Sequence, residues 1–249
     1  MLSPDDGNDL RLVREFFGAR TGYFVDVGAN APQTASQSYH LEQLGWTGIL
    51  IEPQPDLAEA LRRERKAKVY ALACSSPENA GTSMPLQLAG VFSSLNERLP
   101  VATAVPTGTI EVPVRTLDQV LIDAKAPAPI DFLSIDVEGH ETDVLRGFDF
   151  QRWQPRLIVI EDHVLDRRLH NALQARGYAW IRRTGLNSWY VPAASAARLG
   201  VFGRLQFFRK YYLAVPFRQL KQVTRRLRLK WGLVREPQSL YQRILNRDR

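Results

Sequence analysis

The chain has 249 residues, of which 33 are Lys or Arg and 26 are Asp or Glu, giving a formal net charge of +7. Apolar residues make up 45% of it, which excludes a largely disordered protein and is enough for one α/β domain with an extension. The single cysteine, Cys74, excludes a fold built on internal disulfides and favours a reducing, cytoplasmic compartment. The acidic N-terminal residues do not resemble a signal peptide, and no run of 18 apolar residues is present to span a membrane.

The positive charge is concentrated near the C-terminal end. Residues 200–249 contain 13 basic and 2 acidic residues, whereas residues 1–199 contain 20 basic and 24 acidic residues. We therefore expect an α/β domain over residues 1–198, with an insert at about 75–116, and a basic helical tail over residues 199–249.

Hydrophobic periodicity predicts alternating strands and helices in the first part. Helices are expected at 10–18, 33–44, 55–66, 117–124 and 166–176, with a further one ending at Gly147. Strands are expected at 23–27, 48–52, 68–73, 130–136 and 156–161, followed by an antiparallel pair at 178–183 and 188–192. The insert contains alternating runs that suggest a hairpin or an extended segment. This order is typical of a doubly wound, mostly parallel sheet closed by an antiparallel strand.

Acidic residues lie at the carboxyl ends of four predicted strands: Asp26, Glu52, Asp136 and Glu161. Ligands of open parallel sheets bind at these carboxyl ends. The turn after Asp26 contains Gly28 but lacks the further glycines of a dinucleotide loop, and its carboxylate would repel a pyrophosphate. A cationic nucleoside such as S-adenosylmethionine suits it better, with Glu52 accepting hydrogen bonds from the ribose. Taken alone, Gly28 could instead belong to an ordinary turn between a strand and a helix that binds no ligand.

Several separated segments resemble the FkbM family of S-adenosylmethionine-dependent methyltransferases. They are residues 24–30, 45–53, 92–95, 114–118, 131–141, 144–147 and 160–163, in the family's order, so the resemblance covers roughly 20–192. It implies a class I methyltransferase (Rossmann-like) fold and O-methylation of a sugar hydroxyl in a glycan or glycolipid. It also implies cofactor contacts from Asp26, Gly28 and Asn30 on the methionine side, from Ala29 in the same turn, from Glu52 at the ribose, and from Leu72, Ala73 and Cys74 near the adenine. Residues 31–33, Ala-Pro-Gln, depart from the family's usual continuation of the first turn.

Methylation of an alcohol also removes its proton, so a general base or a metal is expected near the cofactor. His163 is the candidate base because it lies two residues after Glu161, on the same strand face if the strand continues. Asp136 and Glu138 are alternative bases, and a structural histidine is the competing interpretation. Asp136, Glu161 and His163 are also candidate ligands for Mg²⁺, which prefers oxygen ligands, although these carboxylates could instead bind cofactor or cap turns.

Other polar residues are less diagnostic. Ser94 in the insert is expected to touch the cofactor or the acceptor, with an ordinary polar loop as an equal alternative. His40 and His170 lie in helical patterns and are expected to be solvated.

Aromatic and basic residues interleave over 201–213, and residues 217–231, after Pro216, have the pattern of a basic amphipathic helix. Binding of residues 201–231 to an anionic membrane is the favoured interpretation, and it suits a lipid-linked glycan acceptor on the inner membrane face. This segment could instead pack on the domain or on a second subunit of a homo-oligomer. It could also form a basic stripe that binds nucleic acid, which is the disfavoured alternative. The alternatives to a saccharide O-methyltransferase are a non-catalytic scaffold with a vestigial cofactor site and an RNA methyltransferase.

Overall fold

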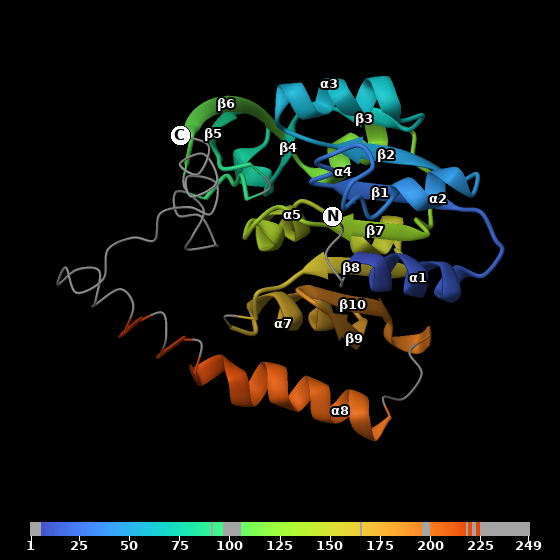
Figure 1. The fold of residues 1–249 in the computed structure, drawn as a ribbon, viewed down its shortest axis with the longest axis vertical. Helices are drawn as coiled ribbons and strands as arrows, with labels where there is room; N and C mark the ends of the chain where they lie inside the picture. Colours follow the sequence, from blue (N-terminus) through green and yellow to red (C-terminus); the bar gives the residue numbers. More distant parts are fainter. Residues whose placement is uncertain are drawn as a thin grey trace, which may run out of the picture.

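The protein is built on a sheet of seven strands (Figure 1). These strands are β1 (Tyr23–Val27), β2 (Thr47–Ile51), β3 (Lys68–Tyr70), β7 (Phe132–Ile135), β8 (Leu157–Glu161), β9 (Tyr178–Thr184) and β10 (Asn187–Pro192). Their order in space is β3-β2-β1-β7-β8-β10-β9; the first five are parallel, and β10 is antiparallel to both of its neighbours. The predicted doubly wound sheet with a closing antiparallel strand is therefore confirmed.

This computed structural model describes residues 6–90, 92–96, 106–164, 166–195, 200–217, 219–220 and 223–224. Side chains from helices α1 (Asp6–Phe17), α2 (Tyr39–Gln43) and α3 (Pro55–Glu64) join one core cluster, on one face of the sheet. Those from α4 (Leu117–Asp123), α5 (Glu141–Arg146), α6 (Phe150–Trp153) and α7 (Arg168–Ala175) join the other. Alternation along β1 explains the division, because Phe24 faces the first cluster while Val25 and Val27 face the second.

The predicted helix at 33–44 is wrong over its first half, because α2 begins only at Tyr39. The segment before α2 is held by Arg65, whose fully buried guanidinium donates hydrogen bonds to the Pro32 carbonyl and to Ser36 Oγ and Ser38 Oγ. Ala35 adopts a positive φ of 59°, which no helix contains. Tertiary hydrogen bonds therefore override the helical periodicity of this stretch.

The predicted strand at 68–73 is divided between two sheets. Strand β3 ends at Tyr70, and β4 (Ala73–Cys74) pairs instead with β6 (Gly108–Arg115) of the insert. Strand β5 (Ser83–Leu88) lies antiparallel to β6, so the predicted hairpin is confirmed as part of a three-stranded sheet. Two short 3₁₀ helices, η1 (Pro77–Asn79) and η2 (Ala193–Ser195), complete the connections among the described residues.

The described part of the tail is helical and packs on the domain. Helix α8 (Val201–Phe208) continues into a π-helical turn, η3 (Arg209–Leu213), and then into residues 214–217, so the helix runs through Pro216. Most of the predicted helix 217–231 lies outside the described residues, although 219–220 and 223–224 are helical. Within the part of the chain that the structure describes, no helix has the length and apolar character needed to cross a membrane.

Candidate functional site

A cleft lies at the carboxyl ends of β1, β2 and β7 and is walled on another side by the insert. Its walls surround about 540 Å³, a volume that includes space open to solvent. Small-molecule sites span roughly 300–1,000 Å³, whereas the enclosed part of this cleft measures only about 50 Å³, so a nucleoside would also occupy the part that is open to solvent. Eight of the predicted site residues line it: Gly28, Asn30, Glu52, Ala73, Cys74, Ser94, Asp136 and Glu138.

Gly28 allows the ends of β1 and β7 to approach each other closely. Its φ is +83°, and a Cβ at this position would lie 1.8 Å from the backbone oxygen of Asp136. The amides of Gly28 and Ala29 also donate to the carbonyl of Ile51, at 2.9 and 3.1 Å. Gly28 is therefore required by the backbone geometry at the floor of the cleft, while Ala29 is buried and does not line it.

Glu52 is held rigidly at the cleft by two backbone amides. Its Oε2 accepts a hydrogen bond from Asn30 N–H and its Oε1 one from Gln54 N–H, both at 2.9 Å. Asn30 reaches this position through a left-handed conformation with φ of 51°. Burial raises the pKa of Glu52 to about 7, and the nearby Asp26 adds to this rise. Each oxygen retains a lone pair that can accept a hydrogen bond from a ligand hydroxyl.

Asp26 lies behind the cleft. Its Oδ2 accepts a hydrogen bond of 2.5 Å from Ser38 Oγ, which in turn accepts one from Arg65. Burial raises the pKa of Asp26, and its hydrogen bond with Ser38 and the charge of Arg65 oppose the rise. Asp26 thus joins β1 to the segment before α2, and its contact with a cofactor stays a prediction, as does that of Ala29.

Ser94 ties the insert to the loop that follows β7. Its Oγ donates to the carbonyl of Glu138 at 2.7 Å and accepts from the amide of Asn96 at 3.1 Å. Ser94 also bridges to Gln87 of β5 through two backbone hydrogen bonds. The insert is therefore fastened across the cleft beside Glu138.

Cys74 contributes an apolar wall to the cleft. Burial raises the pKa of its thiol to about 12, so the sulfur is neutral at physiological pH and is not a nucleophile.

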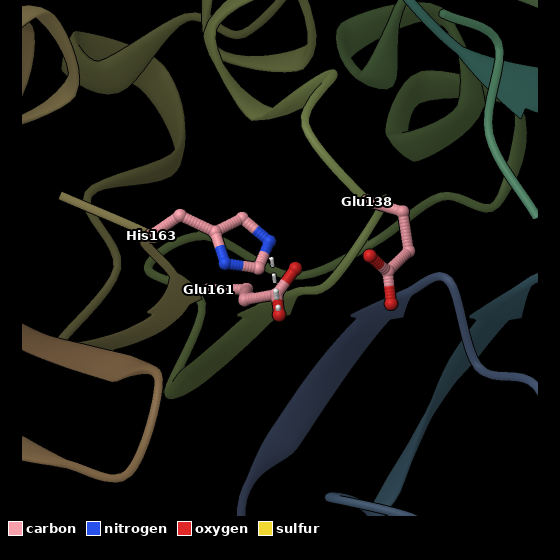
Figure 2. A group of neighbouring side chains, drawn as sticks. All are labelled: Glu138, Glu161 and His163. Carbon is pink, nitrogen blue, oxygen red and sulfur yellow. Dashed lines mark ion pairs between the residues drawn. The ribbon is translucent and has the colours of Figure 1, made fainter. Parts of the chain in front are cut away.

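Figure 2 shows three neighbouring side chains, those of Glu138, Glu161 and His163. Of these, Glu138 lines the cleft. One ligand atom from each lies within 4.8 Å of the others, and His163 Nε2 is 3.6 Å from Glu161 Oε1. Glu138 Oε2, Glu161 Oε2 and His163 Nε2 are buried without a hydrogen-bond partner. Among the described residues, this is the group with spacing suited to a metal ion. We call it the Glu–Glu–His cluster.

The Glu–Glu–His cluster differs from the predicted metal ligands in one member. Glu138 takes the place expected for Asp136, which is exposed at the rim of the cleft. A left-handed turn makes this possible, because Glu138 and Gly139 have φ values of +53° and +95°. Asp136 still adjoins the cluster through a hydrogen bond with Glu161.

Burial sets the charge state of the cluster. Desolvation, with the nearby charges of Asp136 and Glu141, raises the pKa of Glu138 to about 8. Burial and the surrounding carboxylates also raise the pKa of Glu161. Burial lowers the pKa of His163, so its imidazole is neutral at physiological pH. The cluster can therefore accept a proton on His163 or compensate its carboxylates with a cation.

Two residues that shape the cleft are indicated only weakly, or not at all, by the sequence. Arg65, which organises the wall behind the cleft, ends a predicted helix like any surface arginine. His140 lines the cleft, and its Nε2 lies 2.9 Å from Ser75 Oγ. The prediction that His170 is solvated is wrong, because this residue is buried and its Nδ1 lies 3.2 Å from Tyr190 Oη. His40 is half-buried, and neither of its ring nitrogens has a hydrogen-bond partner.

Several solved methyltransferases are similar to this chain in fold. The FkbM methyltransferase of Methylobacillus flagellatus KT is 16% identical with a TM-score of 0.43, and the match covers 69% of this chain but only 43% of that protein. A methyltransferase of Geobacter sulfurreducens is 14% identical (TM-score 0.41; 76% and 80% covered). The N-terminal domain of human METTL16, solved in complex with SAH, is 13% identical (TM-score 0.41; 77% and 70% covered).

No curated protein sequence matches the chain. The sequence profile of the Methyltransferase FkbM domain, however, matches residues 26–179, from Asp26 of the cleft to the start of β9. That span is more than half of the chain and includes the cleft, the insert and the Glu–Glu–His cluster. The chain therefore belongs to the FkbM family of methyltransferases.

Proposed function

We propose that the protein is an S-adenosylmethionine-dependent O-methyltransferase that acts on a sugar hydroxyl of a glycan or glycolipid. The observation that carries the proposal is the neutral, half-buried His163, whose Nε2 has no hydrogen-bond partner and lies beside two carboxyl groups next to the cleft. An acceptor that must lose a proton needs such a group, and an alcohol is that kind of acceptor.

The residues that line the cleft fit the cofactor. Glu52 presents two fixed oxygens to the ribose hydroxyls, and Leu72, Ala73 and Leu86 offer an apolar wall to the adenine. Asp136 and Glu138 place negative charge or hydrogen-bond acceptors where a sulfonium and an amino group would be stabilised. When bound, S-adenosylmethionine supplies an electrophilic methyl group on a neutral leaving group.

His163 would accept the proton of the acceptor hydroxyl at Nε2. Glu161, 3.6 Å from this nitrogen, would stabilise the imidazolium that forms, when its own carboxyl group is ionised. The surrounding residues also exclude water, because Glu138 and Glu161 are both less than 10% exposed.

A divalent cation is a second way to activate the hydroxyl at the same place. The unpartnered atoms of Glu138, Glu161 and His163 offer two oxygens and one nitrogen, and a cation would offset the cost of burying two carboxylates together. A bound cation also lowers the pKa of an alcohol that coordinates it. A chelator distinguishes activation by His163 from activation by a cation, because EDTA would abolish methyl transfer only if a cation is required.

The decisive experiment measures methyl transfer from labelled S-adenosylmethionine to a panel of glycans and lipid-linked sugars. We expect transfer to a sugar hydroxyl, loss of at least about a hundredfold in rate with His163→Ala, and unchanged cofactor binding by calorimetry. His40→Ala, a half-buried histidine outside the site, is the matched control. A folded protein that binds no S-adenosylmethionine would instead support a scaffold, and transfer to RNA alone would support an RNA methyltransferase.

A further inference from the structure

The helical tail uses one of its faces to attach to the domain. Phe207, Tyr211 and Val215, four residues apart, pack against the core that contains α7, β9 and β10. Phe207 lies 5.3 Å from Trp180 and 4.9 Å from His170, measured between ring centroids. The described part of the tail is thus fixed along the edge of the protein, below α7 and β9 in Figure 1.

The opposite face of the same helix is apolar and exposed. Seven large apolar side chains on it are 47–73% exposed: Val201, Leu205, Phe208, Tyr212, Phe217, Leu220 and Val223. They recur mostly at intervals of three to five residues, so they follow one side of a helix, and we call them the outer stripe. A row of exposed apolar residues of this length marks an interaction surface.

The charges around the outer stripe are of one sign. Arg204 and Arg209 are exposed beside it, and the exposed Arg167 of the domain lies over the ring of Tyr212, 4.9 Å from its centroid. From residue 200 to residue 235 the sequence contains ten basic residues and no acidic one. A second copy of the chain would bring the same positive charges to the interface, whereas an anionic lipid surface is complementary to them.

We propose that the outer stripe docks the protein on an anionic lipid bilayer, with the helix lying in the plane of the interface. Aromatic and aliphatic side chains would enter the boundary between headgroups and acyl chains, and the flanking arginines and lysines would contact the anionic headgroups. Such a helix binds a membrane surface without crossing it.

The contact between the tail helix and the domain also links the proposed lipid-binding surface to the Glu–Glu–His cluster. Tyr211 donates a hydrogen bond to Asp162 Oδ2 at 2.7 Å, and Asp162 stands between Glu161 and His163. The outer stripe therefore belongs to a helix that contacts the loop carrying two members of the Glu–Glu–His cluster. If the proposed function holds, this geometry suits an acceptor sugar that is itself attached to a lipid.

The experiment is flotation of the full chain with vesicles of phosphatidylcholine containing 30% phosphatidylglycerol (a composition of roughly one anionic lipid in three). We expect the wild type to float with these vesicles at low salt, to float less at high salt, and to remain unbound with pure phosphatidylcholine. The double substitution L205E/F208E should reduce the bound fraction by about tenfold or more, because it places charge in the apolar stripe.

A matched control replaces two residues of similar exposure outside the tail, Leu44 and Ile122, which are 44% and 46% exposed. L44E/I122E should float like the wild type. The proposal is overturned if the wild type stays unbound, if both double variants lose binding equally, or if L205E/F208E instead dissociates a dimer in solution. S-adenosylmethionine binding by calorimetry should be equal in all three proteins, which keeps this outcome separate from that of the proposed function.

Discussion

Tyr211 Oη donates a hydrogen bond of 2.7 Å to Asp162 Oδ2, joining the tail to a loop 49 residues earlier in the chain. The other oxygen of Asp162 accepts from Val164 N–H at 2.7 Å. Val164 has a φ of +49°, which is strained for a β-branched residue. The tail therefore helps to stabilise the strained loop that positions Glu161 and His163.

Removing this hydroxyl should impair catalysis more than cofactor binding. Tyr211→Phe keeps the ring but leaves Asp162 Oδ2 without its donor, so we expect a loss of about 1–3 kcal/mol in the free energy of unfolding. We also expect a lower kcat and an altered pH profile, with S-adenosylmethionine affinity unchanged by calorimetry. Tyr212→Phe, at the neighbouring exposed position, is the control and should change none of these quantities.

Gly28→Ala should destabilise the protein and close the cofactor cleft. The added Cβ would meet the backbone oxygen of Asp136 at 1.8 Å, so β1 and β7 would have to separate at their ends. We expect a loss of more than about 3 kcal/mol in chemical denaturation and no measurable cofactor binding.

Gly81→Ala is the control for backbone strain alone, because Gly81 has almost the same φ, +82°, but no atom lies within 4 Å of the place that an added Cβ would take. It should cost only about 1–2 kcal/mol. Equal losses for the two variants would contradict the role assigned to the contact between Gly28 and Asp136.

Glu138 should make the protein less stable as the pH rises. Its folded-state pKa of about 8 lies above the ordinary glutamate value of 4.5, so the folded state holds its proton more tightly than the unfolded state. This contribution is complete below pH 4.5 and is lost as the pH rises through 8. Glu138→Gln removes the charge, and we expect it to be more stable than the wild type by roughly 1–3 kcal/mol at about pH 8 but not at about pH 4.5.

Melting temperatures across roughly pH 4.5–8.5, a range that brackets the two pKa values, provide the measurement, with a chelator present so that no cation compensates the carboxylate. Glu78→Gln is a suitable control because Glu78 is exposed and its pKa is lowered rather than raised. A parallel pH dependence of Glu138→Gln and the wild type would refute the assignment of this effect to Glu138.

Arg65→Met should destabilise the protein by about 3–5 kcal/mol, because it leaves the buried carboxylate of Glu42 without its ion pair. The double variant R65M/E42Q should recover part of this loss, as measured by urea denaturation, since the unpaired charge is removed as well. Arg62→Met, at an exposed position in α3, should change stability little.

The order of strands and helices could be predicted because β1, β2, β7 and β8 are short apolar runs that end at acidic or glycine residues. The residues at the carboxyl ends of these strands were also predictable, because parallel strands bring such positions together. Gly28, Glu52 and Asp136 are found at the cleft for this reason.

Features that depend on distant contacts were not predictable. The late start of α2 follows from hydrogen bonds that Arg65 donates to the preceding segment. Arg65 lies beyond the next strand and helix, so no local sequence pattern predicts these hydrogen bonds. Glu138 replaces Asp136 in the cluster because a left-handed turn redirects its side chain. The burial of Tyr211 and His170 depends on the tail returning to the domain, which periodicity alone does not specify.

The hydrogen bond from Ser94 Oγ to the Glu138 carbonyl holds the insert against the cleft, so a ligand bound there would contact the insert. A nucleoside in the cleft would be bounded by Leu72 and Ala73 on one side and by Leu86 and Leu95 of the insert, so it would gain the insert's share of the apolar contact while that hydrogen bond is formed. By thermodynamic linkage, ligand binding must then stabilise the closed insert by the same free energy with which the closed insert stabilises the ligand. Amide hydrogen exchange in residues 83–88 should accordingly slow when the cofactor is bound, and the release of the spent cofactor should be governed by the opening of this segment.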